Sequence, residues 1–595
     1  MNSIQPSRFK EKFTELFGVD LRSLAALRVA MATLIIIDLI RRCRDLVAHY
    51  TDFGVLPRAA LLQDFSRWRI SLHLANGTWE FQALLFGIAG ACALALMLGY
   101  KTHIATVGSW FLLASLHSRN PLILDGGDVL LRLMLFWGIF LPWGACWSVD
   151  RALGPPDIKL PERKLSAATF AYVAQIVFVY WFSVLHKTGP EWHEGTAVYY
   201  TLQFDQVVTP FGQYLLQFPS LLKLLTHSVV WFERIGPLFL FSPILFGPVR
   251  TAAILSFFLL HIGIGICTNV GIFTWAAPFS LLGLLPSWFW DKIPTCLKRT
   301  ERLRTEIYYD QDCSICLRTA RLVERFLLLS KNVVAPAQSN PSIESDMRLH
   351  NSWVVIDHQG TKHFRFSALS TLAARSPLIW PLAIVLRTSF SNRVGDWIYE
   401  VIANHRGCPI NRPSAPPRRS NLKLGISVNL LILFLLGYVF MWNLKTLPNF
   451  HFKLSERSSA LGELLRIDQI WNMFAPRPPM NDGWYVIGGR LKNGEVVDLF
   501  RNGASVSWGK PVSVGNLFQS YRWWKYLLTI WNKGDNNSWL NYSSYLCRAW
   551  NADHDLNETV EHLRIIYVLE TTLPNYDVAP LQKILLFEHH CGEKQ

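Results

Sequence analysis

Charged residues and cysteines are both scarce in this chain. Only 17% of its 595 residues are charged, against about 25% in typical soluble domains. Hydrophobic residues make up 51% of the chain, which excludes a disordered protein. Ten cysteines in 595 residues are too few for a small disulfide-stapled scaffold. This composition indicates a membrane protein with soluble segments.

Acidic residues are fewer than basic ones. The chain has 43 Asp and Glu and 58 Lys and Arg, which gives a net charge of +15. Nucleic-acid-binding proteins are often basic. An apolar chain, however, gathers Lys and Arg in the loops that face the anionic cytoplasmic leaflet. The sequence has no recognition module that interleaves basic with aromatic residues. We therefore expect a lipid bilayer as a partner and no nucleic acid.

Apolar stretches recur at lengths near the roughly 20 residues that cross a bilayer. If the N-terminus is placed on the cytoplasmic side, basic residues are more frequent in the cytoplasmic loops than in the outer ones. This orientation predicts a cytoplasmic middle segment and an outward C-terminal segment. The nine expected spans are 21–40, 82–100, 104–116, 129–146, 167–185, 224–246, 251–267, 270–290 and 424–442.

These stretches set the expected organisation. We predict a polytopic α-helical membrane protein of about eight plus one spans, with an inserted α/β domain and a C-terminal β-rich soluble domain. Its segments are a cytoplasmic N-terminal segment at 1–20, a membrane domain at 21–298, the α/β domain at 299–420, a ninth span at 421–443 and an extracytoplasmic β-rich domain at 444–595.

A β-prone run, a CxxC motif and a helical pattern follow one another in the middle segment. Cys313 and Cys316 come directly after the β-prone run 306–310. At a helix N-terminus the macrodipole and the unpaired N–H groups stabilise a thiolate at Cys313, and Cys316 is placed one turn on to resolve a mixed disulfide. A second β-like run at 353–357 favours a parallel α/β unit. Two other interpretations stay open, an inert pair of buried cysteines and a zinc site.

The run from Tyr309 to Cys316 resembles the DxxCxxC opening of the DCC family (DUF393) of predicted thiol-disulfide oxidoreductases. The run from Asp396 to Arg406 resembles the closing helix of the same family. The resemblance implies a thioredoxin-like fold in the middle segment, catalytic roles for Cys313 and Cys316, and a thiol-redox partner.

Ionisable residues at membrane depth are further candidates, because their burial is costly. Lys187 ends the fifth expected span among aromatic residues that include Trp192. Desolvation there would favour its neutral form and let it act as a base, although a lysine that anchors its helix at the interface has the same pattern. His261, inside the seventh expected span, is either a catalytic group or a neutral histidine satisfied by a neighbouring helix.

Short motifs between residues 21 and 290 resemble the membrane domain shared by the horizontally transferred transmembrane (HTTM) proteins and the vitamin K-dependent gamma-glutamyl carboxylase. In this resemblance Lys187 falls on the lysine thought to deprotonate a reduced quinone, and His261 falls on a histidine of the carboxylase active region. Gly127 and Asp128 stand where the carboxylase has asparagine and histidine, and bacterial HTTM proteins are the nearer match. The motifs are 38–42, 50–57, 98–102, 118–121, 126–128 and 147–150.

Together the resemblances imply a multi-pass protein of the bacterial inner (cytoplasmic) membrane, acting as a membrane oxidoreductase or a carboxylase-like enzyme. A quinone or another lipid-soluble substrate is implied, with reduced quinone as the cofactor and no metal. The alternative is a membrane-anchored thiol-disulfide oxidoreductase or redox sensor with a non-catalytic membrane domain. The expected catalytic residues are Lys187, His261, Cys313 and Cys316, and the expected substrate contacts are Trp192 and Asp128.

Beyond residue 443, β-prone runs alternate with turn residues. Two runs flank Asn493-Gly494, and Asn-Gly between such runs is a strong hairpin signal. Cys547 and Cys591 are candidates for a disulfide, since both lie on the side expected to be oxidising. The terminal residues around Cys591 are expected to be frayed.

Overall fold

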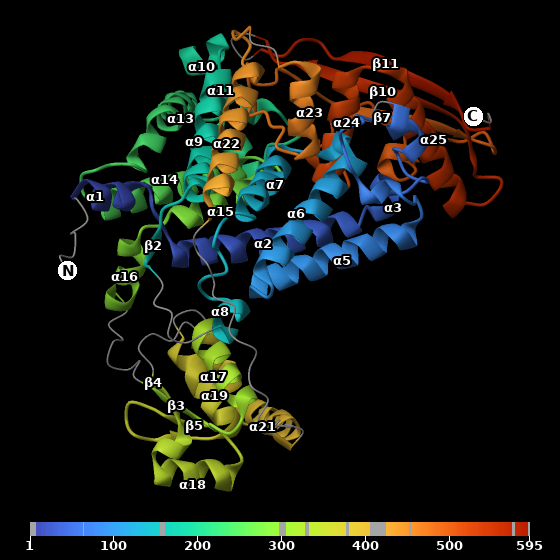
Figure 1. The fold of residues 1–595 in the computed structure, drawn as a ribbon. Helices are drawn as coiled ribbons and strands as arrows, with labels where there is room; N and C mark the ends of the chain where they lie inside the picture. The colour runs from blue at the N-terminus through green and yellow to red at the C-terminus, as the bar shows by residue number, and fades with distance from the viewer. Residues whose placement is uncertain are drawn as a thin grey trace.

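The computed structural model describes residues 8–63, 65–154, 161–296, 305–327, 333–376, 380–404, 424–451, 454–573 and 577–592. Figure 1 shows a helical body, a small α/β domain below it, and a C-terminal sheet with its own helices. The boundaries expected at 298/299 and 420/421 lie outside the described residues.

Five helices of the described chain are long and apolar enough to cross a membrane. α2 lies beside α5, and α9 lies beside α22, with the two pairs running crosswise in Figure 1. Large apolar side chains on these helices remain exposed, among them Leu259 at 69% and Phe434 at 60%. Such an apolar exterior is typical of a surface that contacts lipid or a partner. The five helices are α2 (Leu21–Cys43), α5 (Trp79–Leu98), α9 (Ala167–His186), α14 (Phe246–Cys267) and α22 (Ile426–Thr446).

The other four expected spans differ from the prediction. α6 (Thr102–Arg119) and α13 (Pro219–Phe239) are long helices, but neither is among the five apolar ones. The stretch 129–146 gives only α7 (Gly126–Gly138), after which the chain turns near Pro142. A helix needs about 20 residues to cross a bilayer, so α7 is too short to cross alone.

The stretch 270–290 is also broken. It contains α15 (Phe273–Ser280), the 3₁₀ turn η3 (Leu281–Leu284) and the start of α16 (Ser287–Cys296). Pro286 stands at the second break, where its missing N–H removes a helical hydrogen bond. The remaining short elements of the helical body are α1 (Arg8–Phe17), β1 (Val19–Asp20), α3 (Leu46–Tyr50), α4 (Arg58–Gln63), α8 (Val149–Leu153), β2 (Arg163–Lys164), α10 (Pro190–Glu194), α11 (Ala197–Gln203), α12 (Pro210–Leu215) and α23 (Glu456–Leu464).

The middle domain is built on a four-stranded sheet of order β4-β3-β5-β6. β3 and β4 are parallel and joined through α17, whereas β5 runs antiparallel to β3 and β6 antiparallel to β5. The expected strand, CxxC and helix are therefore present, but the second β-like run is antiparallel, so the unit is mixed. Its elements are β3 (Glu306–Tyr309), α17 (Ser314–Phe326), β4 (Val333–Pro336), α18 (Pro341–His350), β5 (Val354–Ile356), β6 (Lys362–His363), α19 (Arg365–Arg375), α20 (Trp380–Leu386) and α21 (Ser389–Asn404).

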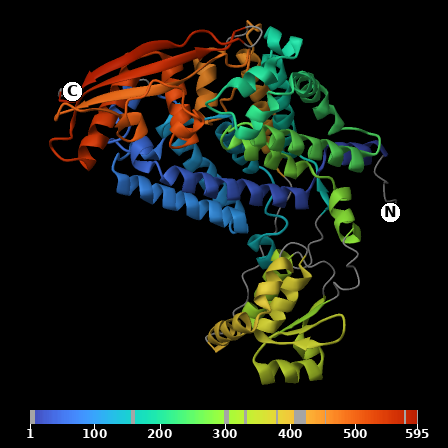
Figure 2. The ribbon, with the colours of Figure 1, turned by 180° about the vertical axis from the view of Figure 1, so that it is seen from behind.

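The C-terminal domain holds a five-stranded antiparallel sheet of order β11-β10-β7-β8-β9. The hairpin expected at Asn493-Gly494 is confirmed, and Gly494 adopts φ +88° in the turn. Two long helices accompany the sheet, so this domain is mixed rather than purely β-rich (Figure 2). Its elements are β7 (Asn481–Leu491), β8 (Val496–Asp498), β9 (Ala504–Ser505), α24 (Tyr521–Lys533), α25 (Asn536–Asp553), β10 (Val560–Thr571) and β11 (Gln582–His590).

A disulfide joins α25 to the end of β11. It links Cys547 to Cys591, with Cα atoms 5.6 Å apart, and confirms the expected pairing. The expectation of a frayed terminus is wrong for the described residues. β11 pairs with β10 as far as His590, and the N–H of Cys591 donates to the carbonyl of Glu561.

Candidate functional site

The CxxC motif lies at the start of α17, as expected. Cys313 directly precedes the helix, and its carbonyl accepts the N–H of Cys316 at 3.1 Å. Only 1% of Cys313 and 2% of Cys316 are exposed, and both belong to one buried cluster with Trp353. Tyr309, Val323 and Leu369 complete this small apolar cluster.

The two cysteines of the motif are not bonded to each other. Cys313 is disulfide-bonded, whereas Cys316 is not part of a disulfide. Reactive cysteines are generally partly exposed, and buried ones are inert. Thiol exchange with a macromolecular partner therefore requires Trp353 to move away from the two sulfur atoms.

The closing helix α21 supports Trp353, the residue that precedes β5. The hydroxyl of Tyr399 accepts the N–H of Trp353 at 3.3 Å. One turn earlier, the carboxylate of Asp396 accepts the N–H of Phe366 at 3.1 Å. Trp353 thus connects the two ends of the domain, because it packs in the cluster of Cys313 and Cys316 and donates a hydrogen bond to Tyr399 of the closing helix.

This βαβ unit with a CxxC at its helix start has the arrangement of a thioredoxin-like redox motif. A family model described as DCC1-like thiol-disulfide oxidoreductase matches residues 307–408. No curated protein and no solved structure matches the chain. The middle domain is therefore similar to DCC1-like oxidoreductases, while the HTTM resemblance of the helical body remains a prediction.

Lys187 caps the C-terminus of α9 and is buried, with 7% of the residue exposed. Its Nζ donates to Oε2 of Glu233 at 2.5 Å and to Oγ of Ser183 at 2.7 Å. The same ammonium lies 5.1 Å from the centre of the Trp192 ring. Sequence reasoning missed Glu233. It is the one acidic residue in the apolar stretch 224–246, and acidic residues inside membrane spans are rare and usually functional.

His261 of α14 contacts the same face of α9. Its Nε2 is 3.0 Å from the hydroxyl of Tyr180, and its Nδ1 is buried without a hydrogen-bond partner among the described residues. Tyr180, Ser183 and Lys187 follow one another at helical spacing, so they share one side of α9. The structure thus brings Lys187 and His261 to one helix face, although each binds a different partner.

Asp128 belongs to a buried ion network rather than to an open site. It lies in the first turn of α7 and is fully buried. Oδ1 of Asp128 accepts from Arg42 at 2.5 Å and from Arg522 at 2.8 Å. Asp38 accepts from the same two guanidiniums, at 2.6 Å and 2.9 Å. Two carboxylates and two guanidiniums therefore balance each other.

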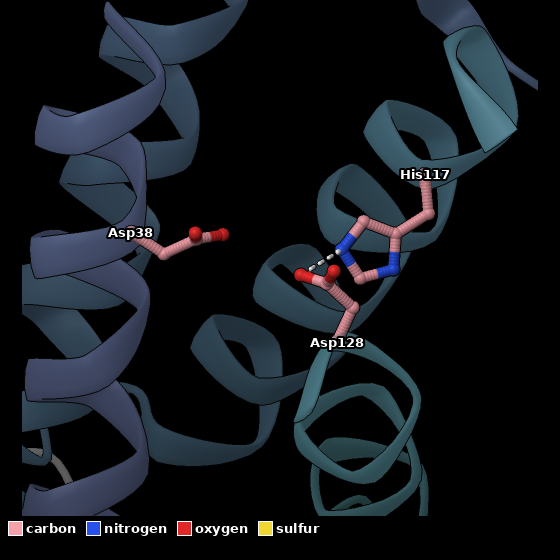
Figure 3. Close-up of side chains that lie close together, drawn as sticks. All are labelled: Asp38, His117 and Asp128. Carbon is pink, nitrogen blue, oxygen red and sulfur yellow. Dashed lines mark ion pairs between the residues drawn. The ribbon is translucent and has the colours of Figure 1, made fainter. Parts of the chain in front are cut away.

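A metal would compete with this network. Asp38, His117 and Asp128 offer ligand atoms within 4.8 Å of one another (Figure 3). His117 is 3.6 Å from Asp128, but both carboxylates already accept guanidinium hydrogen bonds. Burial alone would raise the pKa of Asp128, and the guanidiniums of Arg522 and Arg42 outweigh it and hold that pKa below its usual range. The donor set is thus that of an ion network, not of a ready cation site.

A cavity of about 740 Å³ lies between the helical body and the C-terminal domain. Lys187, His261 and Trp192 do not line it, but His261 and Trp192 each contact a residue that does. Phe273, a lining residue, has its ring centre 5.5 Å from that of His261. The carbonyl of Phe474, another lining residue, accepts the indole N–H of Trp192 at 3.2 Å. Asp128 does not line it either, whereas its neighbours Asp125 and Val129 do.

Proposed function

We propose that the protein is a membrane-embedded thiol-disulfide oxidoreductase that exchanges disulfides at Cys313 and Cys316. The observation that carries this proposal is the match of residues 307–408 to the DCC1-like oxidoreductase model, with the CxxC at the start of α17. Membrane embedding is supported by the five long apolar helices and by their exposed apolar side chains. A bacterial inner membrane is the proposed location.

The exchange uses both cysteines in turn. Once a cellular thiol has reduced the disulfide of Cys313, the Cys313 thiolate attacks a disulfide of the partner protein, so that one partner sulfur leaves as a thiolate and a mixed disulfide forms. The Cys316 thiolate then attacks Cys313 and releases the second partner sulfur. Two electrons pass from the Cys313/Cys316 dithiol to the partner disulfide, and the two thiol protons end on the partner thiols. The reverse sequence oxidises a partner dithiol.

A Cys316→Ser variant of the full chain tests this proposal. We expect it to accumulate a mixed disulfide with a partner in membranes, seen as a reducible high-mass band on a non-reducing gel. Cys313→Ser is the matched control, because it lacks the attacking sulfur and forms no such band. The proposal is overturned if Cys316→Ser shows no adduct under oxidative challenge, or if the band persists in the Cys313→Ser/Cys316→Ser double variant.

A second function is favoured by the shared face of α9. We infer that Lys187 and His261 act on a quinone or another lipid-soluble substrate, with Trp192 as a contact, as the HTTM resemblance implies. The contacts of Lys187 with Ser183 and of His261 with Tyr180, on one side of α9, support this. Quinone-dependent turnover in membranes that vanishes in Lys187→Ala is expected, and full turnover in that variant contradicts it.

A further inference from the structure

The cavity between α24 and the helical body has mostly apolar and aromatic walls. Its volume of about 740 Å³ is enough for a ligand of lipid or drug size. Aromatic side chains supply large apolar contact area for such a ligand. Phe204, Val270, Phe273, Phe474, Trp524 and Trp531 are among its lining residues.

Lys525 of α24 lines this cavity, and no carboxylate of the described residues forms an ion pair with it. It is partly covered, and burial lowers its pKa. Among the described residues its ammonium makes no hydrogen bond or ion pair, and it interacts with Asp125 and Asp128 only at longer range. An ammonium in a largely apolar cavity is costly unless an anion or a hydrogen-bond acceptor binds it.

Asp125 also lines this cavity, next to Tyr521. Its Oδ1 caps α7 by accepting the N–H groups of Gly127 at 2.7 Å and Asp128 at 3.0 Å. Its Oδ2 is buried and lies 4.0 Å from Nη1 of Arg522, and the side chain of Tyr521 is a hydrogen-bonding neighbour of the carboxyl group. Burial, and secondly the charge of Asp128, raise the pKa of Asp125 to about 7. At neutral pH this carboxyl therefore holds its proton part of the time and is able to donate it to a ligand oxygen.

The charges nearby do not neutralise Lys525. Arg42 and Arg522 already balance Asp38 and Asp128 through direct hydrogen bonds. Whenever Asp125 is protonated, the ammonium of Lys525 is the surplus charge at this end of the cavity. A ligand that brings one negative charge there balances the site.

We propose that this cavity binds an amphiphile with one anionic head group, held by Lys525 and Asp125, and an apolar body that lies against Trp524 and Trp531. A carboxylate and a phosphate monoester both provide such a head. The proposal does not depend on thiol exchange, so the Cys313→Ser variant is expected to bind the same ligand.

The test is native mass spectrometry of the full chain in an uncharged detergent. The probes are laurate, dodecyl phosphate, the neutral dodecanol and the neutral ubiquinone-1. We expect one laurate or one dodecyl phosphate per chain, and binding of dodecanol weaker by about tenfold or more. The better of the two anions identifies the head group. Absence of binding by both anions, or equal or tighter binding of either neutral probe, overturns the proposal.

Variants locate the site. Lys525→Met keeps the length of the side chain but removes its charge, and is expected to weaken the anion about tenfold or more. The exposed Lys492→Met is the matched control, with unchanged affinity expected. Leu528→Trp fills the cavity while keeping Lys525, and is expected to block binding even if Lys525→Met fails to fold. Undiminished binding in a folded Lys525→Met or Leu528→Trp variant overturns the proposal.

Discussion

The Nζ atom of Lys187 lies 2.5 Å from Oε2 of Glu233, with only 5% and 11% of their side chains exposed. The pair joins α9 to α13, and Ser183 donates a further hydrogen bond to the same carboxylate oxygen at 3.3 Å. A buried pair of this kind is costly to break, because the remaining charge loses its partner without regaining water.

We therefore expect Lys187→Met to lower the free energy of unfolding by about 3–5 kcal/mol. The double variant Lys187→Met/Glu233→Leu removes both charges and is expected to recover most of that loss. Thermal unfolding of the purified variants measures both. A Lys187→Met protein of full stability that has lost quinone turnover would instead identify Lys187 as a catalytic group.

The ion network of Asp38, Arg42, Asp128 and Arg522 gives a second prediction. Arg522→Met leaves two buried carboxylates to share one guanidinium, and is expected to destabilise the protein by about 3–5 kcal/mol. Arg564→Met is the matched control, since its pair with Glu588 is exposed and such pairs contribute only about 0–1 kcal/mol. Equal unfolding midpoints for the two variants would show that the network contributes little.

The disulfide between Cys547 and Cys591 predicts both stability and location. Cys591→Ser is expected to cost about 2–4 kcal/mol, because the bond restricts the unfolded chain. Disulfides persist in oxidising compartments. Thiol labelling of denatured protein, without reductant, is thus expected to leave both cysteines unlabelled and to label the exposed Cys43. Labelling of Cys547 in protein from intact cells would place this domain on the reducing side.

Asp482 predicts a pH dependence of stability. It is buried in β7, where its Oδ1 accepts the N–H of Gly483 at 2.7 Å and its Oδ2 accepts the N–H of Asp205. Burial raises its pKa to about 7, against about 3.9 in an unfolded chain. The native state then binds more protons than the unfolded state between these values, so this contribution is complete below about pH 4 and is lost as the pH rises through about 7.

The slope from one such group is at most about 1.4 kcal/mol per pH unit. Asp482→Asn is expected to reduce the pH dependence of the unfolding midpoint between about pH 4 and pH 7. Asp555→Asn, a change at an exposed position, is the control and is expected to keep the wild-type profile. An unchanged profile in Asp482→Asn would assign the pH dependence to other groups.

Local patterns were sufficient for much of the fold. The hairpin at Asn493-Gly494 and the strand and helix around Cys313 depend on neighbouring residues, and both are present. Span prediction was less successful, because apolar composition does not reveal breaks such as the one at Pro286. The burial of Cys316 under Trp353 was also not predictable, since the two come from separate elements.

The polar interior was largely hidden from the sequence. The place of Lys187 at a span end marks it as a candidate, whereas its partner Glu233 lies inside an expected span and no motif marks it. Asp128 was noted through a motif, while its partner Arg522 lies in α24, within a segment expected to be a separate β-rich domain. Contacts between residues so far apart follow from packing, which periodicity and motif spacing do not encode.

The bond between Arg522 and Asp38 joins residues separated by 484 positions in the chain. During synthesis, Asp38 and Asp128 leave the ribosome long before Arg522 is made, with Arg42 as the cation that accompanies them. The helical body therefore reaches its final charge balance only after translation of α24. A chain that ended before that helix would contain all five apolar helices. It would still lack one of the two guanidinium groups that neutralise Asp38 and Asp128.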